Sequence, residues 1–308
     1  MSGKKVAAIV VTYKPDSQRL QQLVAALLDD QVTTIVVDNG GGAQCLGEQI
    51  AAGSLHLIDS GKNLGIGAAI NAGIKAAEKF GATHVITFDQ DSGPARGMVQ
   101  RLLDEFQRQS RSGCKIAAVG PSFVDTRQDP PITHPFIRLS MFGSGHRYCA
   151  SKSELIRVDC LITSGCLMSL AALRDVGPMD PDYFVDYTDI EWCFRARSKG
   201  YLLLGSCAVS MTHELGHGTI RRLFGLNLIE YGALRRYYYF RNTLAVARLP
   251  YVQWRWKLRL VIGSLLRLVT LPWAPRASPA LLSLERRMAL RGIRDAIRGV
   301  RGPIVDVT

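Results

Sequence analysis

The first ninety residues alternate between short β-branched apolar runs and longer segments with helical periodicity. Buried strands are expected at residues 6–12 and 83–88, a further strand at 33–37 and a short one at 55–59. Helices are expected at residues 16–30 and 64–80, the first with an apolar face of Leu20, Leu23, Val24, Leu27 and Leu28. This order predicts an α/β fold in which a mostly parallel sheet is covered by helices on both faces.

Polar residues stand where three of these strands end. Thr12 and Tyr13 close the first strand, Asp38 closes the second, and Asp89 closes the run at 83–88. Ligands of such sheets bind beyond the carboxyl ends of the strands. The three ends are therefore expected to converge on one cleft.

The stretch Phe88-Asp89-Gln90-Asp91-Ser92 is the most informative motif. On an extended backbone, Asp89 and Asp91 would point to the same side. Mg²⁺ takes one or two protein carboxylates and fills its other positions with water and phosphate oxygens, so the pair suggests metal–diphosphate chemistry. The alternative is an Asx-rich turn leading into Gly93-Pro94.

Two further segments offer nucleotide contacts. The carboxylate of Asp38 can accept hydrogen bonds from a nucleobase or a ribose, although Asp-Asn-Gly is also a common turn. Asn63 to Asn71 opens a helix whose N–H groups can meet phosphate. Ile70 stands where the third glycine of a dinucleotide fingerprint belongs, so a nicotinamide site is not expected.

Residues 188–191 begin another predicted helix, which runs to Lys199. Thr188 and Glu191 have capping-box spacing, so Glu191 is a candidate to bond its own helix end. Asp189 is not needed for such a cap. Kept ionised by the helix dipole, it is a candidate general base for a hydroxyl group.

His213-Glu214-Leu215-Gly216-His217 matches the HExxH signature of zinc peptidases. That signature requires a helix, whereas residues 208–211 read as a strand and glycines flank His217. His213 is instead expected to ligate the same cation as Asp91 or to bond a phosphate. A locally bonded loop histidine is the third possibility.

Charge divides the 308 residues into two regions. Residues 1–234 hold 23 basic and 23 acidic side chains, whereas residues 235–308 hold 15 basic and 3 acidic ones, which accounts for the net charge of +12. This division favours an enzyme body followed by a segment that meets an anionic surface. The seven cysteines form no C-x-x-C pair and are expected to be mostly small buried side chains in a reducing cytosol. A secretory signal and a membrane-spanning helix are not expected.

The basic region contains two candidate helices. One has an apolar stripe of Trp254, Leu258, Val261, Leu265 and Leu268, and the other a basic stripe of Arg287, Arg291, Arg294 and Arg298. Helices of this type bind anionic lipid surfaces, the alternative being that they pack on the body of the protein. Nucleic acid is not an expected partner, because no recognised binding module accompanies the charge.

Taken in order, these motifs resemble family 2 glycosyltransferases of the GT-A fold, and most closely the bacterial rhamnosyltransferases of O-antigen or rhamnolipid synthesis. The resemblance covers roughly residues 5–245. It rests on the segments Val10–Tyr13, Val37–Asn39, Asn63–Gly65, Asp89–Ser92, Thr163–Cys166, Phe184–Trp192, His213 and Arg236–Asn242.

The resemblance implies a role for each motif. Thr12, Tyr13, Asp38, Asn63, Gly65, Asp89 and Gln90 would hold a nucleotide sugar, with dTDP-L-rhamnose the expected donor. Asp91 and His213 would bind Mg²⁺ or Mn²⁺, and Asp189 would be the base of an inverting transfer. Thr188 stands where the family often has an acidic residue, which favours Asp189 as the base and leaves the role of Glu191 open.

The expected organisation is a catalytic domain at residues 1–245, with its nucleotide-binding part at about 1–110, and a basic helical extension at 246–308. The acceptor is expected to be a glycan or a lipid-linked glycan at the inner face of the bacterial inner membrane, to which a cytoplasmic enzyme would attach peripherally. Two other functions remain open, a zinc metallopeptidase and a sugar nucleotidyltransferase.

Overall fold

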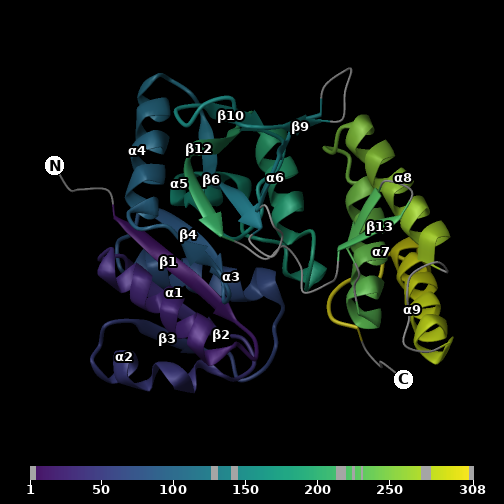
Figure 1. Ribbon diagram of the computed structural model, residues 1–308, viewed down its shortest axis with the longest axis horizontal. Coiled ribbons are helices and arrows are strands. Elements are labelled where there is room, and N and C mark those ends of the chain that lie inside the picture. Colours follow the sequence, from purple (N-terminus) through teal and green to yellow (C-terminus); the bar gives the residue numbers. More distant parts are fainter. Residues whose placement is uncertain are drawn as a thin grey trace.

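The computed structural model describes residues 5–125, 131–139, 145–212, 220–223, 226–229, 232–271 and 279–304, the two segments between 220 and 229 by their backbone only. Its centre is a ten-stranded sheet with the path β10-β12-β6-β11-β4-β1-β2-β3 (Figure 1). Helices cover both faces of this sheet, and three further helices stand beside it. The predicted α/β class is confirmed.

The N-terminal half of the sheet is parallel, as the alternating pattern predicts. Its strands are β1 (Val6–Thr12), β2 (Thr33–Asp38), β3 (His56–Asp59) and β4 (His84–Asp89). Side chains alternate along a strand, so Ile9 packs against α3 (Ile66–Lys79) on one face, and Val10 lies with α1 (Ser17–Asp29) and α4 (Met98–Arg111) on the other. Both helices expected in this region are present within two residues of their predicted ends.

The second half of the sheet adds an antiparallel strand. β11 (Cys166–Ser169) runs antiparallel to both β4 and β6 (Ile116–Asp125). β12 (Leu202–Thr212) then pairs parallel with β6, with an irregularity between Ser206 and Ser210. β11 is followed by α5 (Leu170–Val176), and α6 (Thr188–Ser198) precedes β12. The other short elements are η1 (Ala43–Leu46), α2 (Gly47–Ala51), β5 (Gly93–Pro94), β7 (Ile132–His134), β8 (Phe136–Ile137), β9 (His146–Arg147), β10 (Leu155–Val158), η2 (Pro181–Tyr183), β13 (Ile220–Leu223) and β14 (Leu226–Ile229).

The basic region forms the helices α7 (Ala233–Arg248), α8 (Trp254–Thr270) and α9 (Pro279–Ile297), which lie together to one side of the sheet (Figure 1). α8 is fixed to the body because Trp256 Nε1 donates to Asp159 Oδ2 at 2.8 Å and the Trp256 ring packs on Phe194 of α6. Gly292 of α9 lies so close to α7 that a Cβ there would stand 2.4 Å from the Tyr237 carbonyl oxygen. Among the described helices, none is long and apolar enough to cross a membrane.

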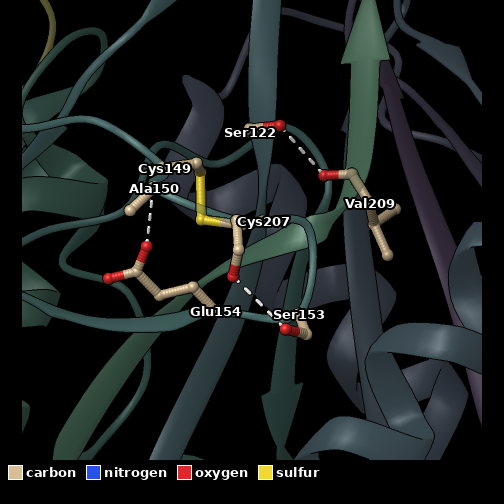
Figure 2. Close-up of a disulfide and its surroundings, with 8 residues drawn as sticks. Ser122, Cys149, Ala150, Ser153, Glu154, Cys207 and Val209 are labelled. Atoms are coloured by element: carbon tan, nitrogen blue, oxygen red, sulfur yellow. Dashed lines mark hydrogen bonds between the residues drawn. A yellow bond between two sulfur atoms is a disulfide. The ribbon is translucent and has the colours of Figure 1, made fainter.

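The cysteines differ from expectation in two respects: two of them form a disulfide, and only Cys166, Cys193 and Cys207 are buried. Cys149 and Cys207 form a disulfide that joins the segment before β10 to β12 (Figure 2). They are 58 residues apart in sequence, a separation that carries no pairing signal. The other five are free thiols, of which Cys166 and Cys193 are buried and Cys45, Cys114 and Cys160 are partly buried.

Candidate active site

The predicted convergence of strand ends is present in the fold. In the parallel register Thr12 pairs with Asp38, and Val11 pairs with Asp89, so β1, β2 and β4 end at one edge of the sheet. Two contacts link these ends. Thr12 Oγ1 lies 3.5 Å from Asp38 Oδ1, and the Tyr13 backbone N–H donates to Gln90 Oε1 at 2.7 Å. The ring of Tyr13 is about half exposed at this edge.

Asp38 shapes the loop that follows it. Its buried carboxylate accepts from the backbone N–H groups of Gly41 at 2.8 Å and Ala43 at 3.1 Å, and Gly40 N lies at 3.3 Å. The turn interpretation of Asp-Asn-Gly is therefore confirmed. A role for Asp38 in binding nucleotide remains a prediction.

Asn63 and Gly65 lie at the start of α3, where this helix meets the segment before α6. Asn63 Oδ1 accepts from Asn39 Nδ2 at 3.1 Å and from the Gly65 N–H at 2.9 Å. Gly65 has a φ of +82°, and a Cβ on it would lie 2.6 Å from the carbonyl oxygen of Phe184. That oxygen accepts the N–H of Ile66, which is an early N–H of α3. This helix start is thus occupied by a protein carbonyl.

The Asp89–Ser92 segment differs from its predicted geometry. β4 ends at Asp89, and the Ser92 N–H donates to the Asp89 carbonyl at 3.1 Å, so residues 89–92 form a turn. The extended-backbone argument for Asp89 and Asp91 is wrong, because Asp91 lies beyond the strand. Both carboxylates nevertheless stand at the sheet edge and are partly buried.

A loop at residues 163–165 joins Asp89 to Asp189. Ser164 Oγ lies 3.4 Å from the Asp89 backbone nitrogen and also bonds Ser92 Oγ. The neighbouring Thr163 N–H donates to Asp189 Oδ2 at 3.1 Å. The two aspartates that sequence reasoning assigned to donor binding and to catalysis therefore share one short loop.

The pKa of Asp189 lies closer to neutral pH than that of an ordinary aspartate. Burial, with a smaller contribution from the negative charges of Asp89 and Asp186, raises the pKa of its carboxyl to about 6, against hydrogen bonds from Ile190 and Thr163 that lower it. A carboxylate with a raised pKa can accept a proton from a hydroxyl group and still be ionised at neutral pH.

The capping box expected at Thr188 is wrong. The N-cap of α6 is Tyr187 with a φ of +69°, and Thr188 is already the first helical residue. The carboxylate of Glu191 does not bond the helix start. It accepts a hydrogen bond from Arg195 Nε at 2.8 Å and another from the Tyr251 hydroxyl. Glu191 therefore ties α6 to the segment between α7 and α8.

Sequence reasoning missed the roles of Arg241 and Asn242 on α7, although it noted the segment that contains them. Both are fully buried and donate to backbone carbonyls of residues 182–186, just before Asp189. No sequence spacing signals this contact, because the partners are more than fifty residues apart.

The predicted metal site can be checked only in part. His213 and His217 lie outside the described residues. Within the described part of the chain, no three histidine, cysteine, aspartate or glutamate side chains gather as ligands for a metal ion. Asp89 and Asp91 offer the carboxylate oxygens that Mg²⁺ and Mn²⁺ prefer, and the charge near Asp189 is negative, so the residues present fit a divalent cation.

Comparison with known families identifies the class of this chain. Residues 7–171 match the model of glycosyl transferase family 2, and the chain belongs to this family. It is therefore a glycosyltransferase. The zinc peptidase and nucleotidyltransferase alternatives lose their support.

Individual relatives extend the match beyond that domain. The chain is 29% identical over 301 residues to the dTDP-rhamnosyl transferase RfbF of Shigella flexneri, covering 97% of this chain and 98% of the relative. It is 26% identical over 190 residues to an uncharacterized protein of Mycobacterium tuberculosis, covering 61% and 67% of the two chains.

Solved structures support the fold. Staphylococcus aureus TarS 1–349 in complex with UDP-GlcNAc aligns with a TM-score of 0.57 at 13% identity, over 96% of this chain and 81% of TarS. GalNAc-T7 with UDP, GalNAc and Mn²⁺ aligns with a TM-score of 0.56 at 12% identity, over 84% of this chain and 54% of that one. The predicted GT-A architecture is confirmed.

Proposed function

We propose that this glycosyltransferase moves L-rhamnose from dTDP-L-rhamnose to a hydroxyl group of a glycan or glycolipid, with inversion at the anomeric carbon. The observation that carries the proposal is the placement of Asp189. Its carboxylate has a raised pKa and shares the 163–165 loop with Asp89 at the strand ends. The similarity to RfbF, which extends over nearly the whole chain, supports rhamnose as the sugar.

The nucleotide would lie over the ends of β1 and β2. Tyr13 offers an exposed ring beside the Thr12 and Asp38 pair, and Asn63 and Gly65 border the same edge. Gln90 holds the Tyr13 backbone and so fixes the edge between the nucleotide and the Asp89 turn. The chemistry required here is hydrogen bonding to a base and a ribose, with the diphosphate directed towards β4.

Asp189 would act on the acceptor. One of its oxygens takes the proton of the acceptor hydroxyl while that hydroxyl oxygen forms its bond to the anomeric carbon. The bond from this carbon to the diphosphate oxygen breaks on the opposite side, and its electron pair leaves with the nucleoside diphosphate. A single displacement of this kind inverts the configuration.

The residues at the β4 end would hold Mg²⁺ or Mn²⁺, with Asp91 the principal ligand, Asp89 beside it and His213 the expected partner. The cation, when bound, would supply positive charge to the diphosphate leaving group. Asp89 also lowers the acidity of Asp189 through its charge, which keeps the base matched to a hydroxyl acceptor near neutral pH.

The acceptor side would face an anionic membrane, which suits a lipid-linked acceptor at the inner face of the bacterial inner membrane. α8 supports this location. Its exposed apolar side chains follow one another at helical spacing, and its charged residues are all basic. The exposed apolar side chains are Trp254, Leu258, Val261, Ile262, Leu265, Leu266 and Val269. Such a helix favours insertion at an anionic lipid surface.

The proposal is tested by incubating the protein with a panel of nucleotide sugars, Mg²⁺ or Mn²⁺, and a lipid-linked glycan acceptor. We expect dTDP-L-rhamnose to raise the melting temperature most and to yield dTDP with a rhamnosylated acceptor. Release of pyrophosphate from a nucleoside triphosphate would instead indicate a nucleotidyltransferase. Transfer from another nucleotide sugar alone would contradict the assignment of the donor.

A further inference from the structure

The turn that leads into α6 is strained. Phe184, Asp186 and Tyr187 all have a positive φ, at 64°, 59° and 69°. Residues other than glycine rarely adopt this backbone conformation. At Phe184 the ψ is −61°, and the Val185 N–H donates to the Tyr183 carbonyl at 2.8 Å. This is the rare γ-turn of the unfavourable hand.

Strained backbone persists only where surrounding contacts determine it fully. Asn242 supplies three such contacts, since its Nδ2 group lies 2.9 Å from the Tyr183 carbonyl, 2.7 Å from that of Val185 and 3.0 Å from that of Asp186. Its Oδ1 accepts from Arg241 Nε at 2.9 Å. A single amide thus holds the carbonyls on both sides of Phe184.

Arg241 completes the clamp. Its Nη2 donates to the carbonyls of Asp182 at 3.0 Å and Tyr183 at 2.9 Å, and its Nη1 donates to that of Gly302. The side chain is only 2% exposed, which is rare for a guanidinium group. A buried cation whose N–H groups go to backbone carbonyls fixes their positions strongly, because each such bond is charge-assisted.

The clamped turn touches both halves of the site. On one side the Phe184 carbonyl oxygen accepts a hydrogen bond from the Ile66 N–H at 2.8 Å and lies against Gly65, beside the expected nucleotide. On the other, Tyr187 caps α6 and Asp189 follows two residues later. Arg235 adds a second hold, with its Nη2 at 2.7 Å from Asp186 Oδ1.

We propose that Arg241 and Asn242 are positioning residues for sugar transfer, which hold the 183–187 turn in its strained form and so set Asp189 against the donor. This inference rests on the proposed role of Asp189 as the base. The two residues touch neither reacting group, so they act through the turn. Their loss displaces the base without removing the nucleotide contacts on β1 and β2.

The test compares kcat and the KM for the donor in Asn242→Asp and wild type. Asp is close to Asn in size and keeps an acceptor for Arg241, but it replaces the donors that hold the three carbonyls. We expect kcat per folded molecule to fall about 100-fold with the donor KM changed by less than about threefold. Thr243→Ala is the matched control, since Thr243 is buried beside Asn242 and bonds only within α7. It should keep kcat.

A second variant, Arg235→Gln, keeps the test decisive if Asn242→Asp does not fold. Arg235→Gln weakens the hold on Asp186 at a side chain that is 37% exposed, so the fold tolerates it. We expect a fall in kcat of about tenfold with little change in donor KM. Wild-type kcat in a folded Asn242→Asp, or in Arg235→Gln if the former does not fold, would overturn the positioning role.

Asp189→Asn is measured in the same assay to separate the two claims. If it loses activity while the clamp variants keep theirs, the proposed function stands and the positioning role fails. If Asp189→Asn keeps wild-type kcat, the base assignment fails, and the positioning role fails with it.

Discussion

Thr163 donates its backbone N–H to Asp189 Oδ2 at 3.1 Å. This hydrogen bond connects the N-terminal turn of α6 to the loop before β11. Because Ser164 in the same loop lies against the Asp89 backbone, one short loop contacts both aspartates. The candidate donor-binding residue Asp89 and the candidate base Asp189 are a hundred residues apart in the sequence, and this loop contacts both of them.

Activity should depend on the protonation of Asp189. Burial raises the pKa of this carboxyl to about 6, and a base works only when it is deprotonated. The kcat/KM of wild type should therefore be half-maximal near pH 6 and fall about tenfold per pH unit below it. A rate profile from acid to neutral pH measures this, and a profile that stays flat well below pH 6 in a folded protein would contradict it.

Removal of divalent cations should abolish transfer. Asp91 and Asp89 carry the oxygen ligands that Mg²⁺ and Mn²⁺ take, so a chelator should remove activity and either cation should restore it. Asp91→Asn should raise the cation concentration needed for half-maximal activity by about tenfold, since one charged ligand is lost. Asp104→Asn, on the exposed part of α4, is the control. Full activity in the presence of the chelator would show that transfer does not require a divalent cation.

Vesicle binding should depend on the outward face of α8. Leu258 and Leu265 are 51% and 55% exposed. Glutamate at either position adds a negative charge that anionic lipid repels, and it removes apolar surface that would insert into the lipid. Each variant should bind anionic vesicles about tenfold more weakly, without loss of activity on a soluble acceptor.

Leu57→Glu provides the matched control for this surface, because Leu57 is also exposed, at 38%, but lies on β3. In a vesicle flotation assay it should bind anionic vesicles as wild type does. Equal binding by all three variants would show that α8 does not meet the membrane. Point variants are preferable to removal of the tail, because α8 is bonded to Asp159.

The contact between α9 and α7 should contribute to the stability of the folded protein. Gly292→Ala places a Cβ 2.4 Å from the Tyr237 carbonyl and should lower the free energy of unfolding by about 1–3 kcal/mol. Gly263→Ala on α8, where a Cβ meets no atom within 4 Å, should raise it by about 0.5–1 kcal/mol. Denaturant titration measures both. A neutral Gly292→Ala would mean that α9 is not docked on α7.

Periodicity predicted the parallel half of the sheet well. The β-branched runs at β1, β2 and β4 are buried on both faces, so their composition identifies them, and parallel pairing then requires their polar ends to meet. The apolar face of α1 was predicted for the same reason, with only Leu28 left partly exposed.

Local motifs were less reliable than the periodic pattern. The capping box at Thr188 fails because Tyr187 adopts a positive φ that nothing in its side chain favours, and the contacts that impose it come from α7. Asp91 leaves the line of β4 because the chain turns at Gln90. The Cys149–Cys207 pair and the Arg241–Asn242 clamp depend on tertiary packing between distant segments, which spacing does not encode.

The central claim is that Asp189 is the base of sugar transfer, and kcat of Asp189→Asn tests it most directly. The measurement uses dTDP-L-rhamnose with a saturating acceptor and a circular dichroism check of the fold. We predict that kcat falls about 10²–10⁴-fold while donor binding is retained, because the amide cannot take the proton. A folded Asp189→Asn with wild-type kcat would contradict the account.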